Sequence, residues 1–113
     1  MMSDPLNSVS NPMSNCGLSL ETVDKLRCVF ARYPEVEQAV LYGSRAKGNY
    51  KHGSDIDLTL HGGALTPSLC ATIADALDEL LLPYMIDLSL YSSLHHPELE
   101  AHIQRVGIVL YQR

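Results

Sequence analysis

Two aspartates, Asp55 and Asp57, stand one residue apart at the start of a run rich in β-branched and apolar residues. Side chains alternate across a strand, so both carboxylates are expected on the same face. Like charges within ~4–6 Å raise each other's pKa unless a cation lies between them. Mg²⁺ binds one or two carboxylates together with substrate phosphates. The pair therefore predicts a site for Mg²⁺ and a polyphosphate.

A second chemical signal precedes the acids, where an apolar run ends at Gly43-Ser44. A glycine after a strand lets backbone N–H groups approach a phosphate, and a following helical turn directs its positive end there. Ser44 adds a hydroxyl donor. Arg45, Lys47 and Lys51 are three of the chain's eight lysines and arginines. Together these residues predict a triphosphate site, although the three cations could equally form a plain solvated loop.

A third carboxylate, Asp87, lies between Ile86 and Leu88 in another expected strand. If that strand neighbours residues 55–60 in register, three acids converge on one open face. Asp87 would then accept the proton of an attacking hydroxyl, a step worth ~10²–10⁴-fold. Two metal ions ~3.5–4 Å apart would clamp the attacking and leaving oxygens of an in-line displacement. The alternative is a surface aspartate on an exposed sheet.

The elements that must position these groups follow from periodicity and capping signals. Ser19 and Thr66 each precede an apolar stripe of helical spacing, and Pro67 suits a first helical position. We expect helices over residues 20–33, 44–47, 67–82 and 97–105, the last closed by Gly107, and strands over residues 36–42, 55–60, 84–91 and 108–111. This order predicts an α/β (α+β) fold with a small mixed sheet and the helices packed on one face.

Length and composition limit the class of protein. At 113 residues, the chain allows one domain, expected over residues 18–113 after a disordered leader at residues 1–17. The net charge of −5 argues against extended binding along a nucleic acid. Three widely spaced cysteines suggest reduced thiols and a cytoplasmic location. No apolar run approaches the ~20 residues of a membrane span.

The histidines offer no metal site by their spacing. His95 and His96 are adjacent, so their side chains point in different directions, and the sequence offers no third ligand near them. We expect this pair, and likewise His61 and His102, to be surface or cap residues.

The pattern as a whole resembles a known family. Gly43-Ser44 followed by Asp55-Ile56-Asp57, in the fuller form GSRAKG…SDIDL, resembles the minimal nucleotidyltransferase (MNT) proteins of the DNA polymerase beta-like superfamily. The resemblance runs over residues 18–111 and includes the third acid in Met85-Ile86-Asp87-Leu88. It implies the polymerase beta-like nucleotidyltransferase fold.

The resemblance also implies roles for the residues that match. Asp55, Asp57 and Asp87 would be the catalytic acids and the Mg²⁺ ligands. Gly43 and Ser44 would hold the triphosphate of ATP. Arg45 and Lys47, which follow them, are predicted from their charge and position to bind the nucleotide as well.

Proteins of this minimal type often act as antitoxins of HEPN-domain ribonuclease toxins. The resemblance implies a protein adenylyltransferase that moves AMP from ATP to a tyrosine hydroxyl of such a toxin and forms a complex with it. Two alternatives remain at this point. One is an antitoxin that acts by stoichiometric binding without catalysis, and the other is nucleotidyl transfer to a small molecule such as an aminoglycoside.

Overall fold

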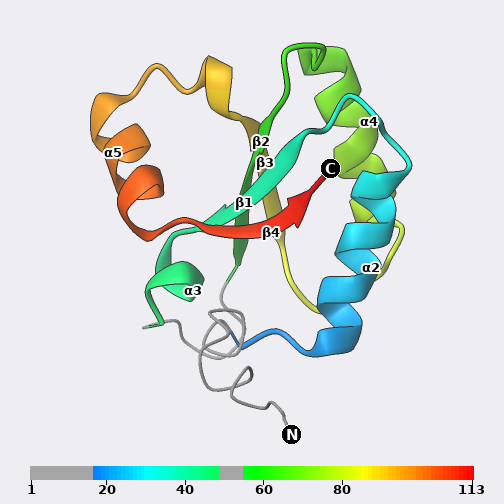
Figure 1. Ribbon diagram of the computed structural model, residues 1–113. Helices are drawn as coiled ribbons and strands as arrows, with labels where there is room; N and C mark the ends of the chain where they lie inside the picture. Colours follow the sequence, from blue (N-terminus) through cyan, green and yellow to red (C-terminus); the bar gives the residue numbers. More distant parts are fainter. Residues whose placement is uncertain (1–16, 49–54) are drawn as a thin grey trace, which may run out of the picture.

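The computed structural model describes residues 17–48 and 55–113. All of the predicted leader except Gly17, and also Lys51, lie outside these residues. The strands β1 (Gln38–Tyr42), β2 (Ile56–His61), β3 (Ile86–Leu90) and β4 (Ile108–Gln112) form a sheet in the order β3-β2-β1-β4 (Figure 1). β1 runs antiparallel to β2 and β4, whereas β2 and β3 are parallel. The predicted mixed sheet is confirmed.

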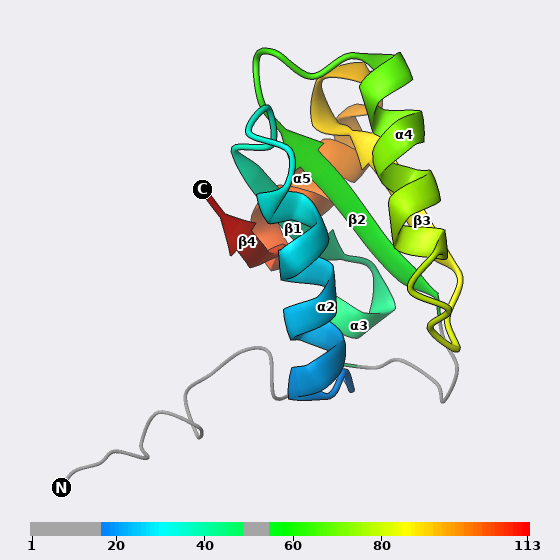
Figure 2. The same ribbon diagram turned by 90° about the vertical axis from the view of Figure 1, so that its right-hand side faces the viewer.

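Two capped helices cover one face of the sheet. Helix α2 (Leu20–Ala31) begins where the Ser19 side chain accepts a hydrogen bond from the backbone N–H of Thr22. Helix α4 (Pro67–Asp78) begins at Thr66 with proline in its first turn, as predicted. Figure 2 shows the two helices side by side in front of the sheet. Helix-start signals are local, and for this reason the sequence locates both starts correctly.

The end of α4 differs from the prediction. The apolar stripe predicts a helix up to residue 82, but α4 ends at Asp78. Leu81 adopts a left-handed conformation with φ of 55°. Proline disfavours helical geometry in the residue before it, so the chain must leave the helix ahead of Pro83. Leu80 and Leu82 therefore pack against the core from outside the helix, whereas Leu81 is exposed.

The main core lies between this pair of helices and the sheet. Alternate residues of each strand point toward the helices, and those of the two central strands, β1 and β2, are fully buried. Phe30 of α2 is buried among them, with its ring centroid 5.9 Å from that of Tyr111. The core side chains include Val23, Leu26, Val29, Phe30, Ala39, Leu41, Ile56, Leu58, Leu60, Ile73, Leu77 and Leu110.

The opposite face of the sheet carries helix α5 (Pro97–Val106), preceded by the short 3₁₀ helix η2 (Tyr91–Ser93). Ile103 of α5 packs on Val40 and Tyr42 of β1, a second and smaller apolar cluster. The helices are thus divided between the two faces instead of all covering one. β1 is apolar on both of its faces, so both need cover.

The short helix α3 (Ser44–Lys47) follows β1 directly. Among the described residues, no helix is both long and apolar enough to cross a bilayer.

Candidate active site

The three acids lie at the start of the two parallel strands, β2 and β3. Asp57 of β2 lies opposite Asp87 of β3 in register, and their side chains share the sheet face away from α2 and α4. Asp55 directly precedes β2. Asp57 is half-buried, whereas Asp55 and Asp87 are exposed. The register on which the predicted convergence depended is therefore present in the fold.

The electrostatics of Asp57 reflect this crowding. Burial raises the pKa of the Asp57 carboxyl above its ordinary value, and the negative charges of Asp87 and Asp55 raise it further. His102 opposes the shift. The ionised form of Asp57 is therefore disfavoured, and a bound cation would reverse that penalty.

The donor set suits Mg²⁺ in its usual mode. Carboxylate oxygens are the hard ligands that this ion prefers, and it commonly takes only one or two from the protein. Across residues 17–48 and 55–113, no three histidine, cysteine or acidic side chains are already gathered into a metal-binding cluster. The acids are neighbours on an open face instead of an enclosed cage, which fits an ion that shares its ligands with substrate phosphates.

Gly43 brings the loop after β1 against the acid strand. Its φ of 78° and ψ of −155° belong to a region open essentially to glycine alone. A Cβ at this position would overlap the Asp57 carboxylate. The Gly43 N–H donates to Nε2 of His102 at 3.2 Å, and its carbonyl accepts from the Lys47 N–H at 3.1 Å. Ser44 is half-buried beside it, at the first position of α3.

The two cations of α3 have different surroundings. Arg45 is 2% exposed, and its guanidinium lies over the Tyr84 ring, 4.7 Å from the centroid. It therefore anchors α3 to the segment that leads into β3. Lys47 is exposed. Nucleotide binding by Arg45 and Lys47 stays a prediction, and the burial of Arg45 gives that residue a packing role in addition.

Three residues that lie at the site were not predicted from the sequence to belong to it. Tyr42 is buried and hydrogen-bonds Ser89, and its pKa is raised first by burial and then by the charges of Asp87 and Asp57. His102, expected at the surface or in a cap, is half-buried with its ring edge-on to Tyr42 at 6.5 Å between centroids. Ser89 could have been found, because it shares a strand face with Asp87. Nothing near His102 in the sequence indicates its contact with the loop.

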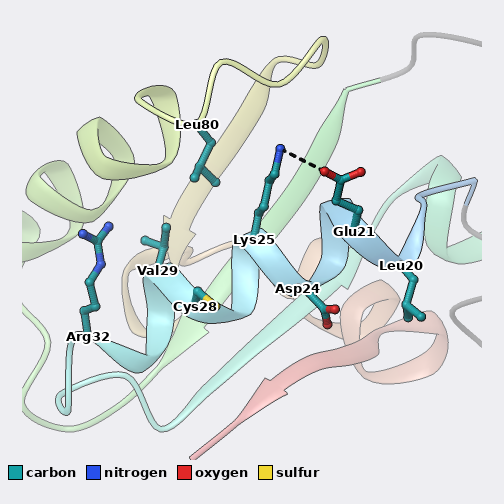
Figure 3. A pocket seen from close by; sticks show the side chains of 8 residues that line it. All are labelled: Leu20, Glu21, Asp24, Lys25, Cys28, Val29, Arg32 and Leu80. Atoms are coloured by element: carbon teal, nitrogen blue, oxygen red, sulfur yellow. Dashed lines mark ion pairs between the residues drawn. The ribbon is translucent and has the colours of Figure 1, made fainter.

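The helical side of the molecule carries a hollow of about 700 Å³ that is separate from the acids. Figure 3 shows its lining, which comes from α2, from Arg32 at the end of that helix and from Leu80 after α4. Lys25 and Glu21 form an ion pair there at 3.6 Å. None of the three site acids contributes to it. Since α2 lies on the opposite face of the sheet, this hollow is not part of the candidate site.

The sequence of the chain matches a known family over most of its length. The model of the family "Polymerase beta, Nucleotidyltransferase" matches residues 24–113, a range that contains the loop and all three acids. No curated protein matches the chain at a significant level.

Several solved structures share the fold. A toxin–antitoxin structure with AMP-PNP has a TM-score of 0.64 and 23% identity, covering 85% of this chain and 75% of that one. The toxin–antitoxin MntA-HepT gives 0.63 and 18%, covering 84% and 74%. A tri-AMPylated Shewanella oneidensis HEPN toxin in complex with MNT antitoxin gives 0.61 and 19%, covering 82% and 71%.

At these identities the structural likeness establishes the fold, while the family match rests on the sequence itself. The matched range spans the whole sheet, the Gly43-Ser44 loop and the acids on β2 and β3. The chain therefore belongs to the polymerase beta nucleotidyltransferase family, and its described residues form a nucleotidyltransferase domain.

Proposed function

We propose that this chain is a Mg²⁺-dependent antitoxin that transfers AMP from ATP to a tyrosine hydroxyl of a HEPN ribonuclease toxin and thereby neutralises it. The observation that carries the proposal is the in-register placement of Asp57 beside Asp87, with the Gly43 loop packed against Asp57. This arrangement supports a site in which the Gly43 loop would hold the phosphates beside the three acids.

In the proposed reaction, the hydroxyl oxygen of the acceptor attacks the α-phosphorus of ATP. A new bond forms between that oxygen and the phosphorus as the bond to the β-bridging oxygen breaks, and pyrophosphate leaves with the electron pair. The Asp87 carboxylate, exposed at the edge of the site, takes the hydroxyl proton. Ser44 and the backbone of the Gly43 loop orient the phosphates. The products are an AMP-modified acceptor and pyrophosphate.

Asp55, Asp57 and Asp87 would hold Mg²⁺, which would neutralise phosphate charge and polarise the reacting oxygens. The raised pKa of Asp57 supports this assignment, because a cation would relieve the repulsion among the three carboxylates.

A protein acceptor is supported by the kind of structures that share the fold. Those neighbours are toxin–antitoxin complexes, and in one of them the HEPN toxin is tri-AMPylated. The exposure of Asp55 and Asp87 also supports an acceptor that arrives on a second protein, because the catalytic face is open to a large partner.

The test is incubation of the full chain with ATP labelled in the α-phosphate, Mg²⁺ and a candidate HEPN-domain toxin from the same genome. We expect label on the HEPN protein, located to tyrosine by peptide mass spectrometry. The variant D55N/D57N should transfer no label. Removal of divalent ions with a chelator should have the same effect.

A matched control replaces two exposed acids of α4, Asp75 and Asp78, in the variant D75N/D78N. It makes the same change of charge and should keep full transfer. Continued transfer by D55N/D57N would refute the proposal. If that variant transfers no label but still neutralises the toxin in cells, the chain acts by binding alone.

A further inference from the structure

His102 connects α5 to the loop that the proposed reaction uses. The Gly43 N–H donates to its Nε2 at 3.2 Å, across 59 positions of sequence. In this contact the backbone amide of Gly43 is the donor and the ring nitrogen Nε2 is the acceptor. This contact holds the backbone N–H of Gly43, the residue at which an added Cβ would overlap the Asp57 carboxylate.

The histidine is itself held firmly in place. The next residue, Ile103, is 4% exposed and packs on Val40 and Tyr42 of β1. The His102 ring also meets Tyr42 edge-on, with the ring planes at 80°. Tyr42 pairs with Asp57 in the ladder between β1 and β2. His102 therefore contacts both Gly43 of the loop and Tyr42 of β1, the residue that pairs with Asp57.

The remaining contacts of Gly43 make this hydrogen bond matter for the loop. The Gly43 carbonyl accepts from the Lys47 N–H within α3, so both polar groups of its backbone have partners. Because glycine has no Cβ, Gly43 can adopt its φ of 78°, and no side chain of its own limits rotation of its backbone. The hydrogen bond to His102 therefore restrains the Gly43 backbone, which has no side chain of its own to hold it in place.

We infer that His102 is a positioning residue for nucleotide binding: its Nε2 holds the Gly43 amide, and so sets Ser44 and the start of α3 at a fixed place relative to Asp57. This inference rests on the proposed nucleotidyl transfer. It gives α5, which supplies none of the three acids, a direct part in arranging the site.

Two substitutions of His102 distinguish the effect of its hydrogen-bond acceptor from the effect of its ring. In His102→Gln, the side-chain oxygen lies near the position of Nε2 and can still accept the Gly43 N–H. In His102→Asn, the shorter side chain places its oxygen nearer the position of Nδ1 and leaves the amide without a partner. Both variants remove the imidazole and its contact with Tyr42, so a difference between them reports the hydrogen bond.

The first measurement is hydrogen exchange of the Gly43 amide by NMR on the ¹⁵N-labelled full chain. Loss of one hydrogen bond predicts exchange faster by about 3- to 10-fold in H102N, and within about twofold of wild type in H102Q. In the transfer assay, KM for ATP should rise by about 3- to 10-fold in H102N, with a smaller change in kcat, and return toward wild type in H102Q.

The matched control is His61, which lies on the same face of the sheet but stacks on Tyr91, 4.5 Å between centroids. H61Q and H61N should leave Gly43 exchange and KM for ATP unchanged. Thermal unfolding of all four variants verifies that each is folded before its kinetics are compared.

The outcomes distinguish the two proposals. Unchanged Gly43 exchange in H102N, or equal defects in H102N and H102Q, overturns the role of His102. Normal transfer by wild type with an unchanged KM in H102N overturns that role alone. If the wild type transfers no AMP, the proposed function is overturned. The contact between His102 and the loop is still supported in that case if exchange of the Gly43 amide is faster in H102N and normal in H102Q.

Discussion

Replacing Asp57 with asparagine should make the protein more stable at neutral pH while it abolishes transfer. Asn is close to Asp in shape, so the packing against Gly43 is retained. The substitution removes the charge that burial and the neighbouring acids Asp87 and Asp55 disfavour. A residue that raises the free energy of the empty folded state is expected where function, and not folding, requires the charge.

The magnitude follows from the strand register. Neighbouring strands lie about 4.8 Å apart, so the in-register carboxylates of Asp57 and Asp87 are roughly 5 Å from each other. Coulomb's law gives about 0.8 kcal/mol at the dielectric constant of water and about 3 kcal/mol at an effective value near 20. Because Asp87 is exposed, we take the lower end, about 1 kcal/mol. For a domain of this size, that raises Tm by about 4–8 °C.

The effect of pH has a definite sign. The pKa of Asp57 in the folded state lies above the ordinary value of 3.8, so folding is penalised when the carboxyl is ionised. The penalty is present in full at pH values above the folded-state pKa. It fades as pH falls through that pKa and is absent below 3.8. The stability advantage of D57N should therefore be present at pH 7 and disappear near pH 3.

The assay is urea unfolding of wild type and D57N at both pH values without divalent ions, followed by addition of Mg²⁺. Mg²⁺ should stabilise wild type and have a smaller effect on D57N. A double-mutant cycle with Asp87→Asn should return a coupling of about 1 kcal/mol that shrinks at high salt. The control D78N changes an exposed acid of α4 and should be close to neutral. An advantage of D57N that persists at pH 3, or additive effects in the cycle, would refute the reasoning.

Three other substitutions test the packing around the site. Gly43→Ala should cost about 1–3 kcal/mol in urea unfolding and eliminate transfer, because φ is 78° and the new Cβ overlaps Asp57. Arg45→Lys should cost about 1–2 kcal/mol, because a lysine cannot reproduce the planar contact over Tyr84. Gly107→Ala should lower Tm by an amount equivalent to about 1–3 kcal/mol, although its φ of −61° suits any residue. The new Cβ would overlap the backbone carbonyl oxygen of Ile103 and lie 2.7 Å from a methyl group of Val40.

Their controls are close by in the chain. Lys47→Ala changes an exposed cation of the same short helix as Arg45 and should leave stability nearly unchanged. Gly63→Ala changes a glycine whose Cβ would meet nothing within 4 Å, so it should be tolerated where Gly43→Ala and Gly107→Ala are not. Equal losses in Gly63→Ala and Gly43→Ala would show that the clash with Asp57 is not the cause.

Much of the architecture was predictable because its signals are local. Ser19 and Thr66 cap the first turns of α2 and α4 through bonds to residues three positions away, so a short stretch of sequence is enough to locate both starts. The alternation around Asp55, Asp57 and Asp87 places each carboxylate on a strand face by the same short-range logic.

The sequence by itself thus determined the types of element, the acids and the loop, whose geometry depends on neighbours along the chain. Only the tertiary structure decided which residues distant in sequence lie in contact at the site. The parallel register sets Asp57 beside Asp87, and the packing of Ile103 on β1 carries His102 to Gly43. The tertiary structure also buries Arg45, a residue that its sequence context would have placed in solvent. Such contacts depend on how apolar faces distant in sequence fit together, and no local pattern encodes that fit.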